Sequence, residues 1–381
     1  MSAYDQSRID ILSDYNNTVQ AVSPGAYTIL EHFADNSEEQ VLQAKGMMLW
    51  GNGNYNVNEA VMGFSSNDFG WAIDASKRGW SNRHLVGYAV SHDEERMAYK
   101  SKMFGNVVAG YSIKTSPVYV PRVAMAYGFV LATPGPKMIW QFDELAYDYS
   151  INTCEDGVTV QEGCRLSNKP VRWDYWTADA NRRKTYYKIA AINHLKATQL
   201  GVAKPTTYFF NSGGFFKKLN LNHVDLNTVV IGNFDASSSS SSVTFAHTGW
   251  WYDYMSGDSL QVTGASQAIT LAAGDWRVYL DKRVSNPYLS QWKALASVAS
   301  ASPKGRCVVM PNPAHGGFEV ALDGVQVACG MLRVMDMAGR TVYEGVWNAG
   351  DRIVTSQWQA GNYWILLSTT SGFYRSHLVV E

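Results

Sequence analysis

The stretch that decides the fold is GYAVSHDEER, residues 87–96. An apolar run over residues 85–90 stops abruptly where the polar residues 91–96 begin. A short apolar run with such a boundary predicts a buried strand. In a parallel (β/α)8 barrel, the side chains that follow the strands point into the active site. We therefore expect His92 and Asp93 to lie at the catalytic rim of a barrel.

The segment AYTILEHF, residues 26–33, shows the same pattern earlier in the chain, with an apolar run that ends at Glu31. Glycoside hydrolysis needs at least two carboxylates, and two that follow barrel strands would meet this requirement. Glu31 is the candidate proton donor, because Leu30, His32 and Phe33 would desolvate it and raise its pKa. The alternative is a surface glutamate that merely follows a strand.

The polar cluster supplies the other candidate site residues. Asp93 is the candidate carboxylate that stabilises the charged transition state, and His92 is placed to donate to a sugar hydroxyl. Arg96 would hold the orientation of the carboxylates. Because His-Asp pairs are common by chance, the prediction of a site rests on the order and spacing of the two strand ends.

The rest of the chain divides into regions of different pattern. Up to about residue 204, short apolar runs alternate with helical patterns, as in β/α units. The expected strands are 27–30, 47–50, 85–90 and 138–142, and the expected helices include 38–45, 121–132 and 181–199. The short alternating strands of residues 205–283 predict an antiparallel β-sandwich, with the serine run 237–242 as a flexible loop. Residues 284–305 are expected to be a linker before an all-β unit, residues 306–381. The predicted fold class is α/β plus all-β.

Composition and charge narrow the function. The formal net charge is -1, with 32 basic and 33 acidic residues and no basic stripe, which makes nucleic acid and anionic membranes poor partners. The 13 Trp, 22 Tyr and 14 Phe residues suit a core, and their flat rings also suit the faces of sugars.

Four cysteines form two pairs along the chain, Cys154 with Cys164 and Cys307 with Cys329. Neither pair has the spacing or the histidine neighbours of a zinc site. We expect two disulfides, formed in an oxidising compartment.

The strand ends carry a resemblance to the α-amylase family, glycoside hydrolase family 13. ILEHF at 29–33 is similar to the acid motif of barrel strand five, MMLWGN at 47–52 falls at strand six, and VSHD at 90–93 is similar to the motif of strand seven. LATPGPKMI at 131–139 resembles the approach to strand eight. The resemblance covers about residues 1–283 and implies a partial barrel, about strands five to eight, followed by the family's C-terminal β domain. It also implies a retaining mechanism on α-1,4-glucans such as starch and glycogen.

One departure from the family pattern concerns the nucleophile. The family's nucleophile is an aspartate at the end of strand four, in a Gly-Phe-Arg-x-Asp type motif, and nothing before Glu31 matches it. Asp5, Asp10 and Asp14 fall in a segment with a helical pattern. We expect an N-terminally truncated chain, without a visible signal peptide, that is inactive alone. We expect no cofactor in this chain, while the resemblance implies a possible calcium ion in the intact family member.

The last region resembles the C-terminal sorting domain of type IX secretion substrates in Bacteroidetes. MPNPAHGGF at 310–318, VMDMAGR at 334–340 and AGNYWI at 360–365 are spaced as β-hairpin landmarks. The resemblance implies an immunoglobulin-like β domain, the type IX machinery as a partner, and an extracellular or cell-surface location. The alternative is a generic immunoglobulin-like module.

These expectations lead to three candidate functions. The first is a secreted α-amylase-like hydrolase that binds α-glucan polysaccharide. The second is a non-catalytic, surface-anchored glucan-binding protein, which the missing nucleophile and the aromatic residues around Trp250 and Trp251 would favour. The third is a transglycosylase of the same family, which these residues do not separate from a hydrolase.

Overall fold

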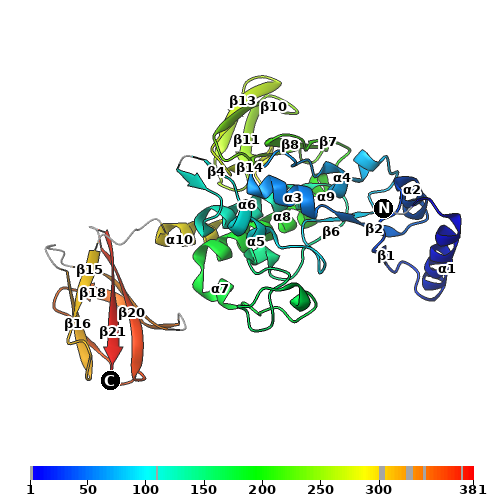
Figure 1. Cartoon of the computed structure of the whole chain (residues 1–381). Helices are drawn as coiled ribbons and strands as arrows, with labels where there is room; N and C mark the ends of the chain where they lie inside the picture. The colour runs from blue at the N-terminus through cyan, green and yellow to red at the C-terminus, as the bar shows by residue number, and fades with distance from the viewer. Residues whose placement is uncertain (1–2, 109, 300–304, 323–328, 338–339, 370–371) are drawn as a thin grey trace. The chain divides into compact units, whose positions relative to one another are not determined.

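The computed structural model describes residues 3–108, 110–299, 305–322, 329–337, 340–369 and 372–381 (Figure 1). The chain forms two compact units, residues 1–172 with 181–292 and residues 173–180 with 293–381. The first unit mixes helices with parallel and antiparallel strands, and the second is built mainly of antiparallel strands. The predicted α/β plus all-β class is therefore confirmed at this level.

Four short parallel strands form the sheet on which the predicted site depends. Their order is β1-β2-β3-β6, and they are β1 (Ile29–Leu30), β2 (Met48–Asn52), β3 (Leu85–Tyr88) and β6 (Lys137–Met138). All residues of β3 are buried, as expected for a strand that is covered on both faces. Because the four strands run in the same direction, their carboxyl ends lie along one edge of the sheet.

Helices connect and cover these strands. Helix α1 (Gln6–Val22) begins at Asp5, whose carboxylate accepts hydrogen bonds from the backbone N–H groups of Ser7 and Arg8, as an N-cap does. The further helices of this part are α2 (Asn36–Ala44), α3 (Asn54–Met62), α4 (Gly70–Ile73), η1 (Ala75–Arg78), α5 (Met97–Phe104), α6 (Ser116–Ala132), η2 (Asp143–Leu145), η3 (Glu162–Cys164), α8 (Ala180–Thr198) and α9 (Leu200–Ala203). A short hairpin, β4 (Val107–Val108) with β5 (Tyr111–Ser112), precedes α6.

Helix α6 is the centre of the first unit. Thirteen of its 17 residues are buried, so the helix is apolar on all sides, and it contacts α3, α5 and strand β9 (Thr228–Asn233). Gly128 is required for this packing, because a Cβ there would lie 2.5 Å from the ring of Trp276. The core around α6 includes residues between 57 and 202 and residues between 210 and 292. The boundary expected at residue 204 therefore does not separate two cores.

Arg122 of α6 is 1% exposed and joins three segments through backbone carbonyl groups. Its guanidinium group donates to Ala60 and Val61, near the end of α3, at 3.2 and 2.7 Å. It also donates to Phe234 and Asp235, which follow β9, at 2.5 and 3.3 Å. Burial lowers the pKa of Arg122. Since the planar guanidinium group carries five N–H donors, one side chain satisfies carbonyls from two distant parts of the chain.

Antiparallel strands form the rest of the first unit, where Figure 1 shows the β10 and β13 strands above β11 and β8. One sheet has the order β12-β11-β14-β9-β8-β7, and a separate ribbon pairs β10 with β13. The strands are β7 (Thr207–Asn211), β8 (Phe216–Asn222), β10 (Ser239–Thr244), β11 (Gly249–Asp253), β12 (Ser259–Val262), β13 (Ser266–Leu271) and β14 (Trp276–Leu280). An apolar cluster with Ile231, Val243 and Trp251 lies between this sheet and the ribbon.

The prediction of a flexible loop over residues 237–242 is wrong for residues 239–242, which belong to β10. The serines pair with β13, and the hydroxyl oxygens of Ser240 and Thr270 are 2.6 Å apart. Serine-rich composition favours a loop only when no partner strand is present. Here β13 supplies the backbone partners and the hydroxyl groups bond across the strands.

The region expected to be a linker, residues 284–305, contains helix α10 (Leu289–Ala299). Trp292 of this helix is buried in the core of the first unit. The side-chain amide of Asn286 donates to the carbonyl oxygen of Tyr254 at 2.9 Å. The first part of the predicted linker is therefore packed against the first unit.

The second unit is built on a seven-stranded sheet with the order β18-β17-β20-β21-β15-β16-β19. The strands are β15 (Gly305–Met310), β16 (Gly317–Leu322), β17 (Cys329–Asp336), β18 (Thr341–Asn348), β19 (Arg352–Val354), β20 (Gly361–Thr369) and β21 (Gly372–Val380). The unit also includes α7 (Asp174–Ala178). Its own apolar core includes Phe318, Trp347 and Ile365. None of the helices in the described ranges is long and apolar enough to cross a lipid bilayer.

The polar residues of the predicted landmarks hold the turns of the second unit. Asn312 donates to the carbonyl of His377 and accepts from the N–H of Val379, both at 2.8 Å. The carboxylate of Asp336 accepts from the backbone N–H and the Nε of Arg340, which closes the β17–β18 connection. Residues 338–339 of that landmark lie outside the described residues.

Candidate active site

The parallel sheet brings the predicted site residues to one edge. Glu31 directly follows β1, and His92 and Asp93 follow β3 after three intervening residues. Strand β2 lies between β1 and β3, with Leu30 opposite Leu49. All three site residues therefore lie at the carboxyl ends of the parallel strands.

The side chains of Glu31, His92 and Asp93 meet at this edge. The Nε2 atom of His92 lies 3.9 Å from the Oε1 atom of Glu31 and 3.8 Å from the Oδ2 atom of Asp93. One polar atom of each side chain lies within 4.8 Å of those of the other two. The side chains are 46%, 45% and 55% exposed, respectively, so the cluster is open to solvent and to a ligand.

Two supporting roles expected from the sequence are wrong. The expected desolvation of Glu31 is not found, because its side chain is 46% exposed and the Nε2 atom of His32 lies 2.8 Å from the buried carboxylate of Glu38 instead. Arg96 does not contact the site carboxylates and instead donates to the carbonyl groups of Ser91 and Glu94. Arg96 is 4% exposed, and this burial lowers its pKa. Its role is to hold the turn that carries His92 and Asp93.

The two glutamates after Asp93 also act on the loop. The carboxylate of Glu94 accepts from the backbone N–H and the hydroxyl of Ser91, and from the side-chain amide of Asn52. The carboxylate of Glu95 accepts from the hydroxyl of Ser150 at 2.7 Å and from the N–H of Ile151 at 2.8 Å. The four residues of the DEER sequence therefore have two roles. Asp93 faces the site, and the next three residues fix the loop.

Aromatic rings surround His92, and the sequence analysis did not identify them as site residues. The centroid of the imidazole ring lies 5.9 Å from that of Trp50 and 5.9 Å from that of Trp140. A cavity of about 630 Å3 opens beside them and is lined by Ile29, Glu31, Trp50, Val86, Lys137, Met138 and Ile139. Trp50 lies within β2 and Trp140 lies two residues after β6, so both rings belong to the parallel strands or to the segments that follow them.

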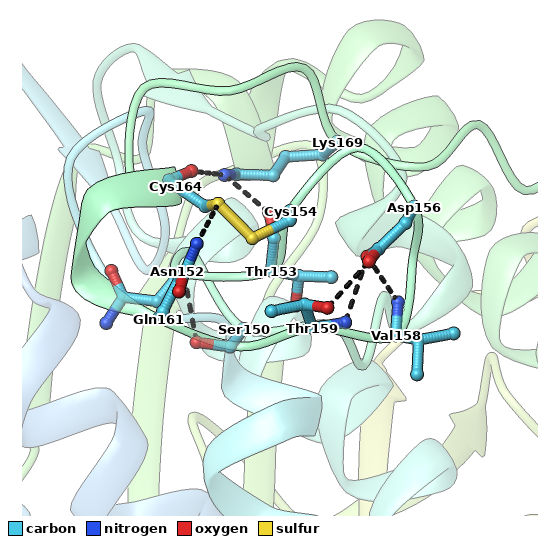
Figure 2. The surroundings of a disulfide bond; sticks show 10 residues. All are labelled: Ser150, Asn152, Thr153, Cys154, Asp156, Val158, Thr159, Gln161, Cys164 and Lys169. Atoms are coloured by element: carbon cyan, nitrogen blue, oxygen red, sulfur yellow. Dashed lines mark hydrogen bonds between the residues drawn. A yellow bond between two sulfur atoms is a disulfide. The ribbon is translucent and has the colours of Figure 1, made fainter.

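A disulfide-bonded loop adds a further residue to the site. The structure contains a disulfide between Cys154 and Cys164 (Figure 2). Lys169 bonds to this loop by donating to the carbonyls of Thr153 and Cys164 at 2.9 and 2.6 Å. Arg165, next to the disulfide, places its NH2 atom 3.6 Å from the carboxylate of Asp93. The loop thus positions a positive charge beside a candidate site carboxylate.

The second expected disulfide is absent. Cys307 is a buried free thiol and Cys329 is an exposed one. Burial raises the pKa of the Cys307 thiol to about 11, which keeps it protonated.

Replacing Cys154 and Cys164 together by serine should lower the free energy of unfolding of the first unit by about 2–3 kcal/mol, since the disulfide closes a loop of roughly ten residues. Urea unfolding without reductant measures this change. Cys329→Ser, at an exposed free thiol, is the matched control and should change stability by less than about 0.5 kcal/mol. Equal stabilities of the double variant and the control would contradict the prediction.

The group formed by Glu31, His92 and Asp93 does not fit the calcium ion that the resemblance implies for the intact family member. Within the described ranges, Glu31, His92 and Asp93 form a group of three side chains that could share a metal ion. Calcium prefers six to eight oxygen ligands, and this group offers one nitrogen and two carboxylates.

Comparisons with known proteins concern the fold and the C-terminal region. Residues 308–381 match the family described as secretion system C-terminal sorting domain. No curated protein sequence matches the chain significantly. The fold is similar to that of an α-amylase from Geobacillus thermoleovorans solved with acarbose (TM-score 0.54, 13% identity, 72% of this chain and 58% of that chain). It is also similar to that of an Anoxybacillus α-amylase (TM-score 0.53, 11% identity, 72% of this chain and 56% of that chain). A cyclomaltodextrin glucanotransferase is a third similar structure (TM-score 0.51, 15% identity, 72% of this chain and 54% of that chain).

At these identities the likeness shows the fold alone, and the chain spans less than three-fifths of the length of each of these three enzymes. The match at residues 308–381 indicates type IX secretion and a location outside the cell or on its surface. The chain therefore joins a fold similar to part of the α-amylases to a C-terminal sorting domain of the type IX secretion system.

Proposed function

We propose that this chain carries the acid/base part of a secreted, retaining α-1,4-glucan hydrolase. The observation that carries the proposal is the convergence of Glu31, His92 and Asp93 at the carboxyl edge of one parallel sheet. In this proposal Glu31 protonates the leaving glycosidic oxygen and then takes a proton from the attacking water. Asp93 stabilises the positive charge of the transition state, and His92 donates to a sugar hydroxyl. The chain binds α-glucan outside the cell and the type IX machinery during export.

The proposed architecture is a partial (β/α)8 barrel, with β1, β2, β3 and β6 as strands five to eight. This assignment is supported by the parallel order, the connecting helices and the cavity on the sheet face that contains Ile29 and Val86. Strands β1 and β6 are the two edges of the sheet, where further barrel strands would pair. The second unit is proposed to be the immunoglobulin-like sorting domain.

The nucleophile is proposed to come from the barrel strands that pair with the edge at β1. A retaining glycosidase needs a second carboxylate on the opposite side of the anomeric carbon from the acid. Asp5, Asp10 and Asp14 do not supply it, because Asp5 caps α1 and the other two lie on that helix. None of the three follows a strand of the sheet.

A non-catalytic glucan-binding protein is the second candidate, and one observation favours it. Trp250 is 54% exposed on β11, so its ring is free to stack on a sugar. Trp251 does not contribute, because it is fully buried and its indole N–H donates to the carbonyl of His247. A transglycosylase is a further candidate, since the fold is also similar to that of a cyclomaltodextrin glucanotransferase.

The purified 381-residue chain should hydrolyse soluble starch at a negligible rate, because no glycosyl-enzyme forms without a nucleophile. Release of reducing sugar measures this rate. If Glu31→Gln abolished a measurable turnover by this chain, the chain would contain its own nucleophile and the partial-barrel proposal would fail.

A longer polypeptide distinguishes the hydrolase from the binding protein. It joins this chain to the preceding barrel strands, whose sequence is read from the coding sequence upstream of Met1. Starch hydrolysis by the extended polypeptide supports the hydrolase. Binding without hydrolysis supports the non-catalytic candidate.

A further inference from the structure

A groove on the antiparallel part of the first unit has an unusual lining. It has a volume of about 340 Å3 and lies between strands β7 and β8 on one side and β10 on the other. Its lining residues are Phe209, Asn211, Lys218, Asn220, Asn222, Ser242, Thr244, Phe245 and Ala246. The lining therefore combines an aromatic ring, which is 66% exposed at Phe209, with three asparagine amides.

The register of the sheet explains why these side chains share one face. Phe209 pairs directly with Asn220, and Asn211 pairs with Lys218. On the next strand, Asn220 pairs with Val229 and Lys218 with Ile231. Because directly paired residues point to the same side of a sheet, the face is apolar at β9 and becomes polar at β8 and β7.

The apolar part of this face is the part that the ribbon covers. The β9 residues Val229 and Ile231 face the ribbon and form an apolar cluster with Val243 and Phe245. The opposite face of β7 and β8 is apolar, with Phe210 and Leu219 in the core. Beyond the cluster, the same face carries amides and an exposed aromatic ring.

The amides keep hydrogen-bonding groups available to a ligand. Asn220 donates to the carbonyl of Thr244 at 2.7 Å, which leaves its carbonyl oxygen and a second N–H. Lys218 donates to Ser241 and Ser242 at 3.0 and 2.9 Å, so two of its three N–H donors are occupied. The side chain of Asn211 makes no hydrogen bond to other residues in the described part of the chain.

We propose that this groove binds a neutral carbohydrate chain, with the apolar face of one sugar ring stacked on Phe209. Amide groups both donate to and accept from hydroxyl groups, and a ring with a flat exposed face supplies contact area at low entropic cost. A volume of about 340 Å3 lies within the range of small-molecule sites. The groove contains no carboxylate, and two of the three N–H donors of its lysine are occupied, so the amide groups are the main partners for the hydroxyl groups of a ligand.

The identity of the sugar rests on the proposed function, which makes an α-glucan the ligand. The groove would then hold a polysaccharide at a second position, away from Glu31 and His92. Native gel electrophoresis of the full chain, with soluble amylopectin in the gel, measures this binding through the loss of mobility.

Phe209→Ala is the decisive variant and should weaken amylopectin binding about tenfold, while Phe209→Trp should preserve it. Phe104→Ala is the matched control, since it removes a 54% exposed phenylalanine ring from α5, outside the groove, and it should leave the affinity unchanged. An unchanged far-UV spectrum and unfolding midpoint would show that Phe209→Ala is folded, as expected for an exposed side chain.

Each variant is also made in a His92→Ala background, where the factor lost with Phe209→Ala should be the same, because distant sites act additively. Wild-type affinity in Phe209→Ala, or an equal loss in Phe104→Ala, would overturn the proposal. A chain that does not bind amylopectin would also overturn it. That result would leave the hydrolase proposal standing, since the latter is judged by starch turnover of the extended polypeptide.

Discussion

Glu31→Gln is expected to lower the rate of starch hydrolysis by about three orders of magnitude in the polypeptide that also carries the preceding barrel strands. Glutamine has the shape of glutamate but no proton to give to the leaving oxygen, and general acid catalysis contributes about 10²–10⁴-fold. Steady-state kinetics on soluble starch measures this loss in kcat. An effect of less than tenfold would exclude Glu31 as the acid.

Two comparisons separate loss of the proton donor from general damage. Glu162→Gln makes the same chemical change on the exposed helical turn η3, outside the cluster, and should leave kcat unchanged. A substrate with a nitrophenyl leaving group needs little protonation to depart, so its first bond cleavage should be much less sensitive to Glu31→Gln. Equal losses on starch and on the nitrophenyl substrate would indicate a disturbed site and not a missing acid.

Arg122→Leu is expected to destabilise the first unit by about 3–5 kcal/mol, the usual cost of removing one partner from a buried charged network. Leucine fills part of the space, but it leaves the carbonyl groups of Ala60, Val61 and Phe234 buried without their donor. Each such group costs about 1–3 kcal/mol. Urea unfolding followed by tryptophan fluorescence measures the change.

Arg283→Leu is the control for this experiment. Arg283 is exposed and lies over the ring of Tyr252 at 4.2 Å, a contact worth about 0.5–1 kcal/mol at a surface. If the two variants had the same stability, the carbonyl contacts of Arg122 would carry no net stabilisation.

The elements that sequence reasoning identified best are those with a strong local signal. The apolar runs that became β2 and β3 and the long helical pattern of α8 were predicted to within a few residues. Strands β7 and β8 were not identified individually, although Leu219 and Leu221 alternate with Lys218, Asn220 and Asn222 as in a half-buried strand.

The site residues also differ in how well the sequence predicted them. Glu31, His92 and Asp93 were found because each follows a strand, and the sheet brings them together. The partner of Asp93, Arg165, lies 72 residues further along the chain in a loop that has no periodic pattern. Arg96 was assigned to the carboxylates because of its charge, but sequence alone does not show whether an arginine will reach a side chain or a backbone carbonyl.

The buried position of α6 has a consequence for the order in which the exported chain folds. The helix cannot cover its apolar surface alone, since Arg122 must meet Phe234, which lies 112 residues away in the chain. Contacts of such long sequence separation form slowly, because a large loop must close before they bring any stabilisation. Until β9 and β14 are in place, the apolar residues 123–132 stay exposed and invite aggregation. Export of this protein without aggregation therefore depends on how long α6 stays exposed before the last strands that cover it have formed.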